Sequence, residues 1–408
     1  MSAMVIVGAG ECGARTAMNL RSAGWTGDVV LFGAETLLPY ERPPLSKAAL
    51  LGIGDPQPAT LYSEQDFADA RVSHRGGVRV DRIDRETRQV ILSTGEAIDY
   101  HKVLLATGAT PRTLPIAAGF ETVHMLRTHD DALRLRSRLT RGARITVVGG
   151  GFIGLELAAC AAEKGCRVTV LEAAPRLLGR AVPAEVASVL HARHLNAGVD
   201  IRCGVTVTDL TEVGGIATVV LADGSSIDTD ALVVGIGAIP DTDVAEKSRL
   251  QVDNGIRVDR YLATSDPDVF AAGDCCSFPH PLFGDRHIRL ESWRNAQDQA
   301  AVAAANMCGG SEIYTAVPWF WSDQFDLGLQ VAGMPDEADR EVVRRRPDGI
   351  DIRYGLDPAG RIVSAAAVGP GNAVAKDIRL AEMMIAKRIS PDPDLLADPS
   401  VNVKALLR

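Results

Sequence analysis

The sequence contains few aromatic residues and no cysteine motif of the kind that carries metal or disulfide chemistry. Aromatic residues make up 5% of the 408 residues, and the seven cysteines include no C-x-x-C pair. A disulfide scaffold and a structural zinc site are therefore not expected, and we predict no metal centre. The net charge of −9 also disfavours binding to nucleic acid, because phosphate binding needs a basic surface.

Long hydrophobic runs are missing as well. No apolar run reaches the roughly 18 residues that a membrane helix needs, and the chain opens without the basic segment of a secretory signal. We therefore expect no membrane association and a cytoplasmic location. Hydrophobic residues make up 46% and charged residues 23% of the chain, which is typical of a globular protein with two or three domains.

One local pattern occurs twice: an apolar run, a glycine-rich turn, a helical stretch and a second apolar run. In the first copy we expect a strand at 4–7, the turn at 8–13, a helix to about residue 24 and a strand at 29–32. In the second copy we expect a strand at 145–148, the turn at 149–154, a helix through Glu163 closed by Gly165, and a strand at 168–171. Each copy predicts a βαβ unit.

Both turns have the form G-x-G-x-x-G, which in this setting indicates a dinucleotide site. The first glycine permits the tight turn, the second lets a pyrophosphate approach the backbone, and the third lets helix and strand pack closely. An acidic residue about 20 positions further on should bind ribose hydroxyls, and Glu35 and Glu172 fit that rule. A carboxylate at Glu172 favours NADH over NADPH, although the nearby Arg176 leaves NADPH open.

The remaining pattern divides the chain into an α/β protein with three domains. Apolar strands at 102–105 and 231–234 are expected to end the two nucleotide-binding folds, and a strand with an acidic turn is expected at 268–274. An alanine-rich helix is expected at 297–307, followed after Trp321 by strands near 328–333, 341–346, 350–355 and 361–368 and a helix around 373–387. We predict a discontinuous FAD-binding domain (1–112 and 241–320), an NAD-binding domain (113–240), both Rossmann-like, and a small α+β C-terminal domain (321–408).

Several longer segments resemble the NADH-dependent ferredoxin reductases of oxygenase systems, a family that includes putidaredoxin reductase, rubredoxin reductase and the reductase component of biphenyl dioxygenase. The resemblance rests on both glycine turns, on 39–47 (PYERPPLSK), on Ala106-Thr107-Gly108 and on Ala272-Gly273-Asp274. It extends over essentially the whole chain, through Glu291-Ser292-Trp293, 319–324 (WFWSDQ) and 397–403 (ADPSVNV). It implies a glutathione-reductase-type fold with FAD in the N-terminal site and exchangeable NADH in the second.

The resemblance also implies roles for individual residues. Lys47 and Glu156 are the predicted catalytic residues: a cation near the pyrimidine end of the flavin stabilises its reduced form, and Glu156 matches an acid beside the nicotinamide. Arg42 would lie on the flavin side, Asp274 at the ribityl chain, and Trp293 and Trp321 at the flavin or its exposed edge. The full set of predicted cofactor-binding residues is Gly8, Gly10, Glu11, Cys12, Gly13, Glu35, Arg42, Lys47, Ala106, Thr107, Gly108, Arg127, Gly149, Gly151, Phe152, Ile153, Gly154, Glu156, Glu172, Gly237, Gly273, Asp274, Glu291, Ser292, Trp293 and Trp321.

The missing thiol indicates the electron acceptor. Disulfide reductases of this architecture pass electrons to a cysteine pair, but residues 39–47 contain no cysteine, and the adjacent Cys275 and Cys276 suit a structural role. Electrons must then leave the flavin for an external one-electron carrier. The resemblance implies a two-iron two-sulfur ferredoxin that serves a Rieske dioxygenase or a cytochrome monooxygenase.

Three alternatives remain open at this point. They are an NADH oxidase, a monodehydroascorbate-type reductase, and a flavin-binding signalling protein resembling apoptosis-inducing factor. We expect a monomer or a weak homodimer. Local arginines at 286–294 or 344–346 could attract an acidic ferredoxin, although a charged run is usually a solvated face.

Overall fold

The computed structural model describes residues 2–52, 54, 56–179 and 182–407. The chain forms two compact units. Unit 1 comprises Met1–Glu41, Pro58–Thr110 and Ile239–Pro318, and unit 2 comprises Arg42–Gln57, Pro111–Ala238 and Trp319–Arg408. Two short strands, β7 (Ala109–Pro111) and β16 (Ala238–Pro240), lie where the chain passes from one unit to the other.

Unit 1 is built on a seven-stranded sheet in the order β3-β2-β1-β6-β5-β4, with β18 also paired to β6. Its strands are β1 (Ala3–Val7), β2 (Val29–Phe32), β3 (Val72–Arg75), β4 (Val80–Asp84), β5 (Gln89–Leu92), β6 (Ala97–Leu105) and β18 (Val269–Ala271). The pairs from β3 to β6 are parallel, whereas β5 pairs with β4 and β6 antiparallel. All five residues of β1 are buried, as expected of a central strand covered on both faces.

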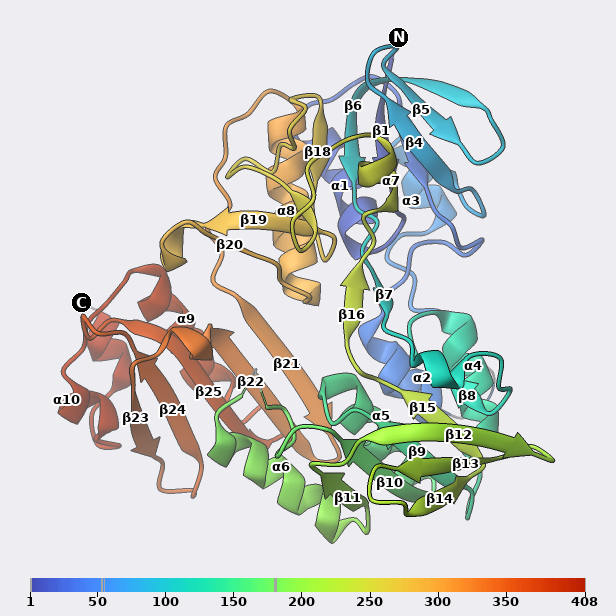
Figure 1. Cartoon of the computed structure of the whole chain (residues 1–408). Helices are drawn as coiled ribbons and strands as arrows, with labels where there is room; N and C mark the ends of the chain where they lie inside the picture. Colours follow the sequence, from blue (N-terminus) through green and yellow to red (C-terminus); the bar gives the residue numbers. More distant parts are fainter. Residues whose placement is uncertain (1, 53, 55, 180–181, 408) are drawn as a thin grey trace. The chain divides into compact units, whose positions relative to one another are not determined.

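Helices cover this sheet, and a smaller sheet completes unit 1 (Figure 1). The helices are α1 (Glu11–Ser22), α3 (Glu64–Asp69), α7 (Asp243–Lys247) and α8 (Trp293–Met307), of which α1 and α8 pack on each other. The smaller sheet has the order β17-β19-β20, with β17 (Ile256–Arg257), β19 (Cys276–His280) and β20 (Arg286–Ile288), and a 3-10 turn at Pro281–Phe283. Because β1, β2, β6 and β18 are parallel, the loops after them meet at one edge of the large sheet.

The first half of unit 2 is a second parallel sheet, in the order β11-β10-β9-β15-β8. Its elements are β8 (Val123–His124), α4 (His129–Arg138), β9 (Arg144–Val148), α5 (Phe152–Glu163), β10 (Arg167–Glu172), α6 (Ala184–Asn196), β11 (Asp200–Cys203) and β15 (Ala231–Val234). An antiparallel sheet of β12 (Val207–Val213), β13 (Ile216–Leu221) and β14 (Ser226–Thr229) packs its apolar side chains against this fold. Short turns of the same unit are Pro43–Ser46, α2 (Ala48–Leu51) and Pro115–Ala117.

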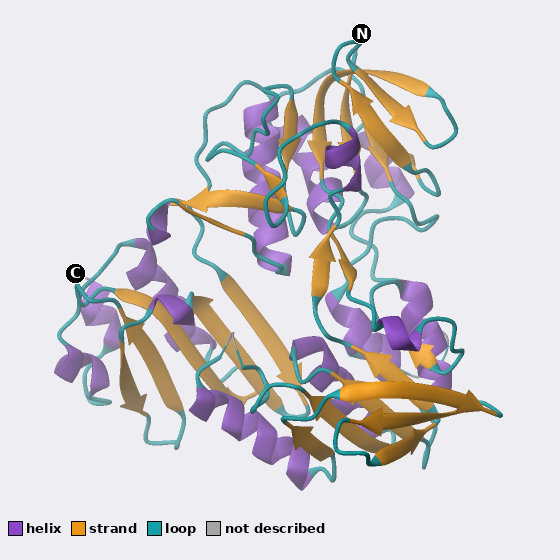
Figure 2. Ribbon diagram, in the orientation of Figure 1, coloured by secondary structure: helices purple, strands orange, loops and turns teal. Residues whose placement is uncertain are grey.

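The second half of unit 2 is an antiparallel sheet with helices, visible as the group of long strands near the C-terminus in Figure 2. The strands follow the order β21-β22-β25-β24-β23, and α9 packs on β22 and β25. The elements are β21 (Trp319–Gln324), β22 (Leu327–Gly333), a 3-10 turn (Pro335–Glu337), β23 (Arg340–Arg345), β24 (Asp351–Leu356), β25 (Ile362–Pro370), α9 (Ala375–Ala386), α10 (Pro393–Ala397) and a 3-10 turn (Val403–Leu407).

The predicted elements occur in the expected order, but some bounds differ, and several elements, including the helices α4 and α6, were not predicted. The helix expected from Gln297 begins at Trp293, because Ser292 caps its first turn by accepting a hydrogen bond from the Asn295 amide, 3.2 Å long. The aromatic segment at 319–321 belongs to a strand, β21. The strands between 72 and 92, and those between 207 and 229, were not anticipated. In the part of the chain that is described, no helix is long and apolar enough to cross a membrane.

Candidate functional site

The first and third glycines of each fingerprint lie where no side chain fits. Gly8 has a φ of +109°, and a Cβ there would lie 2.2 Å from a carbonyl oxygen after β6. A Cβ on Gly13 would lie 1.9 Å from the Gly8 carbonyl oxygen. In the second copy, a Cβ on Gly149 or Gly154 would lie 2.3 or 2.1 Å from a backbone oxygen. Because backbone atoms cannot move aside as a flexible side chain can, these positions require glycine.

The second glycine of each fingerprint is open instead. A Cβ on Gly10 or Gly151 would meet no atom within 4 Å. These glycines are the N-caps of α1 and α5, and neither helix start has a side-chain cap, whereas Ser292 caps α8. The first N–H groups of both helices therefore have neither a side-chain acceptor nor a side chain that fills the space before them, which suits a bound phosphate. The residues present fit two dinucleotides, one in each unit.

In unit 1, the acid after β2 is held beside the first fingerprint. Tyr40 donates a hydrogen bond of 2.5 Å from its hydroxyl to Glu35 Oε2, which fixes the carboxylate near the carboxyl edge of the sheet. Glu11, in the first turn of α1, is paired with Arg15 and accepts a hydrogen bond from Gln297 Nε2. Its negative charge is therefore compensated at the helix start, where a phosphate would otherwise be repelled.

The segments after β6 and β18 end at the same edge of unit 1. Thr107 donates from its hydroxyl to the Asp241 carbonyl oxygen, 2.5 Å away, and Gly108 has a positive φ. The Gly273 amide donates to Gln299 Oε1, 2.7 Å away, and Gln299 Nε2 is buried with no hydrogen-bond partner among the described residues. An unsatisfied buried donor beside this loop is consistent with a ligand acceptor there.

The other predicted residues of unit 1 form a small polar group after β20. Arg289 Nη1 donates to the Asp274 carbonyl oxygen over 3.3 Å and is ion-paired with the exposed Glu291. Trp293, the first residue of α8, is half-buried. Arg289 therefore holds the Asp274 loop, and with 12% of its side chain exposed it offers little charge to a partner.

In unit 2, Glu172 lies at the end of β10 against the second fingerprint. Its Oε2 accepts a 2.7 Å hydrogen bond from the Gly150 amide, and its Oε1 accepts one of 2.7 Å from the Ala174 amide. The carboxylate is thus fixed within the glycine loop, as a ribose-binding acid would be. Arg176 donates to the carbonyl oxygens of Leu177, Leu178, Gly179 and Val182, so its guanidinium is committed to its own loop.

Both predicted catalytic residues belong to unit 2 and contact each other. Lys47 Nζ lies 3.3 Å from Glu156 Oε1 and 3.5 Å from Asp323 Oδ2. Glu156 is 4% exposed, and it accepts hydrogen bonds from the Ser46 hydroxyl at Oε2 and from the Ser322 hydroxyl, 2.7 Å away, at Oε1. Three donors therefore converge on a nearly buried carboxylate, which compensates the cost of burying its charge.

Aromatic side chains of β21 adjoin this cluster. The ammonium of Lys47 lies 5.3 Å from the centroid of the Trp321 ring, and Trp321 Nε1 donates to Asp323 Oδ2 over 3.1 Å. The rings of Trp319 and Trp321 stack with centroids 5.3 Å apart. Of the predicted site residues, Lys47, Glu156 and Trp321 are thus brought together.

The remaining predicted residues of unit 2 have simpler settings. The ring of Phe152 meets that of Phe320 edge to face, with centroids 5.0 Å apart, while Ile153 is 47% exposed. Gly237 has a φ of +101°. Arg42 donates from Nη1 to the Arg127 carbonyl oxygen, and the Arg127 amide donates to Asp131 Oδ2 over 3.1 Å.

The cysteines do not form a redox centre. All seven are free, and Cys12, Cys275 and Cys276 are buried. Burial raises the pKa of each of these three thiols, which keeps them protonated and unreactive. Cys275 Sγ donates to the Leu105 and Ala272 carbonyl oxygens over 3.5 and 3.3 Å, which agrees with the expected structural role. The described residues also contain no group of three metal-ligating side chains.

The prediction that the arginines at 344–346 form one exposed charged run is wrong for Arg344. Arg344 is 6% exposed and donates four hydrogen bonds to the carbonyl oxygens of Leu396, Asp398, Pro399 and Val401. Its charge is used to hold the C-terminal segment on β23 and is not available to a partner. Arg346 is ion-paired with Asp348 and Asp377, so Arg345 alone of the three is well exposed.

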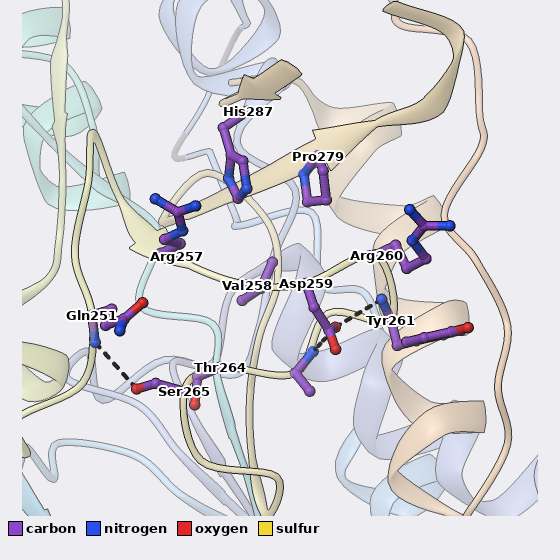
Figure 3. A pocket seen from close by; sticks show the side chains of 11 residues that line it. Gln251, Arg257, Val258, Asp259, Arg260, Tyr261, Thr264, Ser265, Pro279 and His287 are labelled. Atoms are coloured by element: carbon purple, nitrogen blue, oxygen red, sulfur yellow. Dashed lines mark hydrogen bonds between the residues drawn. The ribbon is translucent and has the colours of Figure 1, made fainter. Parts of the chain in front are cut away.

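A surface hollow of about 530 Å³ in unit 1 does not coincide with any predicted site residue (Figure 3). It is lined by the segment 257–265, Gln251, Pro279 and His287. Its arginines are ion-paired, Arg257 with Asp253 and Arg260 with Asp285. Because the arginines that line it are already ion-paired and no predicted site residue lies in it, we do not assign the cofactor sites to this hollow.

Sequence reasoning missed four polar residues that complete the two sites. Tyr40 and Ser46 lie inside the segment 39–47, and Ser322 and Asp323 lie inside 319–324; both segments carry the family resemblance, but the sequence prediction gives these four side chains no role. Their hydroxyls and carboxylate contact the acids Glu35 and Glu156 or Lys47. A signal was present in each case, namely a hydroxyl or carboxylate residue close in sequence to a residue with a predicted role.

Comparisons with known proteins cover the chain from end to end. Residues 2–300 match the model of the pyridine nucleotide-disulphide oxidoreductase family, and residues 319–407 match the reductase C-terminal family. The chain is 44% identical to the ferredoxin–NAD(+) reductase component of an anthranilate 1,2-dioxygenase system from Burkholderia cepacia, over 99% of this chain and 98% of that protein. It is 38% identical to putidaredoxin reductase from Pseudomonas putida, over 99% and 96% of the two chains.

Solved structures agree. The reductase in the covalent putidaredoxin reductase–putidaredoxin complex superposes with a TM-score of 0.93 at 36% identity, covering 100% of this chain and 98% of that one. A ferredoxin reductase from Rhodopseudomonas palustris superposes with a TM-score of 0.94 at 38% identity, covering 100% of both chains. The predicted resemblance, the α/β fold class, the oxidoreductase class and the FAD and NAD(H) pair are confirmed, while the roles of single residues stay predictions. The chain belongs to the pyridine nucleotide-disulphide oxidoreductase family, with a reductase C-terminal domain at residues 319–407.

Proposed function

We propose that this protein is an FAD-dependent NADH:ferredoxin oxidoreductase. The observation that carries the proposal is the combination of two open dinucleotide cradles, at Gly10 and Gly151, with seven free cysteines that form no redox pair. Such a chain can take electrons from a nicotinamide but has no disulfide-forming pair of cysteines to which it could pass them. Full-length similarity to proteins named as ferredoxin–NAD(+) reductases and putidaredoxin reductase supports a ferredoxin as the acceptor.

The chain's own residues would bind and orient the reactants. The N–H groups at the start of α1 would hold the FAD pyrophosphate and Glu35 its ribose, while those of α5 and Glu172 would do the same for NADH. When bound, FAD accepts two electrons as a hydride and releases them one at a time. Lys47 and Glu156 would form the charged wall beside the reacting rings, with Trp321 next to them.

Charge balance assigns the cluster a simple task. Overall, one NADH and two oxidised ferredoxin molecules would give NAD+, two reduced ferredoxin molecules and one proton, which is released to water. During hydride transfer, negative charge would develop on the flavin and positive charge on the nicotinamide. The Lys47 ammonium would stabilise the first and the Glu156 carboxylate the second. No general acid or base is needed for the hydride step itself.

Several finer points belong to the same proposal. We propose that the ferredoxin carries a two-iron two-sulfur cluster and serves a Rieske dioxygenase or a cytochrome monooxygenase. We further propose a cytoplasmic location, a monomer or weak homodimer, and the domain boundaries and residue roles derived from the sequence. Relatives named as components of dioxygenase systems support the first point for a dioxygenase.

Anaerobic stopped-flow absorbance tests the function. NADH is mixed with the holoenzyme, and a two-iron two-sulfur ferredoxin is added in a second mixing step. We expect reduction of the flavin by NADH and reoxidation by ferredoxin much faster than by oxygen. A flavin that NADH reduces but that no ferredoxin, rubredoxin or cytochrome reoxidises faster than oxygen would refute the proposal. Rapid NADH consumption with oxygen alone would instead support an oxidase, and slow reduction with an NADH-induced dimer would support a signalling protein.

A further inference from the structure

A continuous chain of hydrogen bonds links Glu156 to a buried histidine of unit 2. Ser322 Oγ, which donates to Glu156 Oε1, accepts a hydrogen bond from Gln324 Nε2 over 3.1 Å. Gln324 Oε1 in turn lies 3.0 Å from Nε2 of His194 on α6. Ser322, Gln324 and His194 are 0%, 1% and 0% exposed, so water does not compete with these contacts. The chain therefore starts at the predicted nicotinamide residue and ends at a titratable group to which the proposed chemistry assigns no role.

The direction of each hydrogen bond follows from the carboxylate. Ser322 has one hydroxyl proton and gives it to Glu156, so its oxygen must accept from its other neighbour. Only the amide nitrogen of Gln324 can supply that proton, which turns the amide oxygen of Gln324 towards His194. His194 must then carry a proton on Nε2. One orientation of the serine, one orientation of the amide and one histidine tautomer are thus fixed together.

The surroundings of His194 favour the neutral ring with this tautomer. His194 Nδ1 is buried and has no hydrogen-bond partner among the described residues, and a lone pair is cheaper to leave unpaired there than an N–H group. The His194 ring packs edge to face on the Phe325 ring, with centroids 5.0 Å apart. The Arg193 guanidinium lies 4.2 Å from the centroid of the Phe325 ring and is ion-paired with Asp326. Burial lowers the pKa of His194, against the opposing effect of the Gln324 hydrogen bond.

The opposite side of the carboxylate is also fixed. Ser46 donates to Glu156 Oε2, and the Ser46 carbonyl oxygen accepts from Cys160 Sγ over 3.2 Å, one turn further along α5. The strand β21 packs on α5, so the serine of β21 and the acid of α5 approach each other from neighbouring elements (Figure 1). Both oxygens of Glu156 are therefore held from outside its own helix. Rotation of the carboxylate would break hydrogen bonds on both sides.

We propose that Gln324 and His194 are positioning residues that hold the Glu156 carboxylate in one orientation through Ser322, with His194 neutral and protonated at Nε2. The inference rests on the proposed function for the use of Glu156, but the hydrogen-bond directions do not depend on it. Neither residue touches the reactants in this scheme. They act by keeping the charge of Glu156 fixed where the nicotinamide becomes positive, which favours the transition state over the bound ground state.

The tautomer is tested without turnover. In nitrogen-15 NMR of the oxidised holoenzyme labelled at histidine, the resonance that disappears in His194→Gln is assigned to His194. We expect the signature of a neutral ring protonated at Nε2. A ring protonated at Nδ1 would overturn the inference, because Nε2 could then not donate to Gln324 and the amide would have to reverse.

The positioning role is tested by separating the rate of flavin reduction from NADH binding in stopped-flow experiments. We expect Gln324→Leu and His194→Leu to lower the limiting rate about tenfold while the Kd for NADH changes less than about threefold. His194→Gln retains an N–H donor towards Gln324 and should recover most of the rate. Gln330→Leu serves as the matched control, because Gln330 is 9% exposed in the adjacent strand and lies outside the chain of hydrogen bonds.

The outcomes are distinguishable from failure of the proposed function. Equal rates for wild type and Gln324→Leu, or equal losses in both histidine variants, would overturn the positioning role even if ferredoxin is reduced normally. A wild-type enzyme that reduces no carrier would refute the proposed function and leave the tautomer result intact. If the leucine variants do not fold, the tautomer in the wild type still decides the inference.

Discussion

Alanine substitutions at Gly151 and Gly154 should separate cofactor binding from folding within one fingerprint. Gly151 precedes α5 with φ −84° and ψ −176°, which alanine adopts without strain, and its Cβ would meet nothing within 4 Å. The added methyl group would instead occupy the space before the helix N-terminus. A Cβ on Gly154 would lie 2.1 Å from the Gly149 carbonyl oxygen and 3.2 Å from Val147 Cγ1.

We expect Gly151→Ala to change the affinity for NAD+ and Gly154→Ala to change the stability of the fold. For Gly151→Ala, losing a hydrogen bond to a charged phosphate costs about 2–3 kcal/mol, so the Kd for NAD+ should rise roughly 30- to 150-fold with little change in Tm. For Gly154→Ala, better helix propensity contributes about 1 kcal/mol, but overlap with a backbone oxygen costs more, since overpacking alone reaches about 3 kcal/mol. We expect a net loss of about 2 kcal/mol and a Tm lower by roughly 5 °C.

Two measurements on the purified holoenzyme check this. Calorimetric titration with NAD+ gives the affinity, and thermal unfolding followed by circular dichroism gives the Tm. Gly10→Ala is the matched control: it should lower the FAD content but leave the NAD+ affinity of the molecules that retain FAD unchanged. Normal NAD+ binding by Gly151→Ala, or a Gly154→Ala variant as stable as wild type, would refute the assignment of roles to these glycines.

Three further predictions follow from single contacts. Glu172→Arg should weaken NADH use and improve NADPH use, measured as the ratio of kcat/KM values. Glu172→Gln, which removes the charge and keeps one acceptor oxygen for either the Gly150 or the Ala174 amide, is the control, and an unchanged preference in Glu172→Arg would exclude Glu172 from the ribose site. Arg344→Ala should lower the free energy of unfolding by about 3 kcal/mol, because four hydrogen bonds to carbonyl oxygens are lost. Arg345→Ala is the control: its side chain is 82% exposed, so the free energy of unfolding should change by less than about 0.5 kcal/mol. Burial lowers the pKa of His280 to about 4, so between about pH 6.5 and 4 the unfolded chain binds a proton at this residue while the folded chain does not. The free energy of unfolding should therefore fall by about 3 kcal/mol as the pH is lowered through that window. His280→Gln should flatten this part of the curve of unfolding free energy against pH, and a curve as steep as that of wild type would contradict the assignment.

The geometry at His280 gives an independent reason for the last prediction. Nε2 lies 3.0 Å from the Ala316 carbonyl oxygen and must donate to it, while Nδ1 accepts from the Leu282 amide over 3.3 Å. A second proton on the ring would have to sit on Nδ1, facing that N–H group. The folded state therefore excludes the charged form by a specific contact as well as by burial.

The parts of the fold that could be predicted from sequence are those whose signal is local. The glycine turns, the apolar strands before them and the helices after them lie within about 30 residues of each other, and the strand Val29–Phe32 was predicted with its observed ends. The strands at 72–92 and 207–229 were missed because they are short, half-exposed and carry charged residues, as in Val80–Asp84. Their identity as strands depends on pairing with neighbours, which a single-sequence pattern does not reveal.

The chemical site was predicted in part for the same reason. Lys47 and Glu156 were each identified within their own motif, but nothing in the sequence indicated that they touch. Their contacts with Ser46, Ser322 and, through Gln324, His194 join four segments that are far apart in the chain. Which hydroxyl reaches the Glu156 carboxylate is decided by how α5 packs on β21 and on the turn at Pro43–Ser46.

The arginines at 344–346 show where a local rule would have improved the prediction. They were treated as one charged run, although the same segment was predicted to be a strand, in which successive side chains point to opposite faces. Alternation alone separates Arg344 from Arg345, and the structure buries Arg344 while Arg345 is exposed. Arg344 can be buried because four carbonyl oxygens of the segment 396–401 accept hydrogen bonds from its guanidinium. A charged run within a strand should therefore be read one face at a time, and a charge on the inner face implies acceptors that come from elsewhere in the chain.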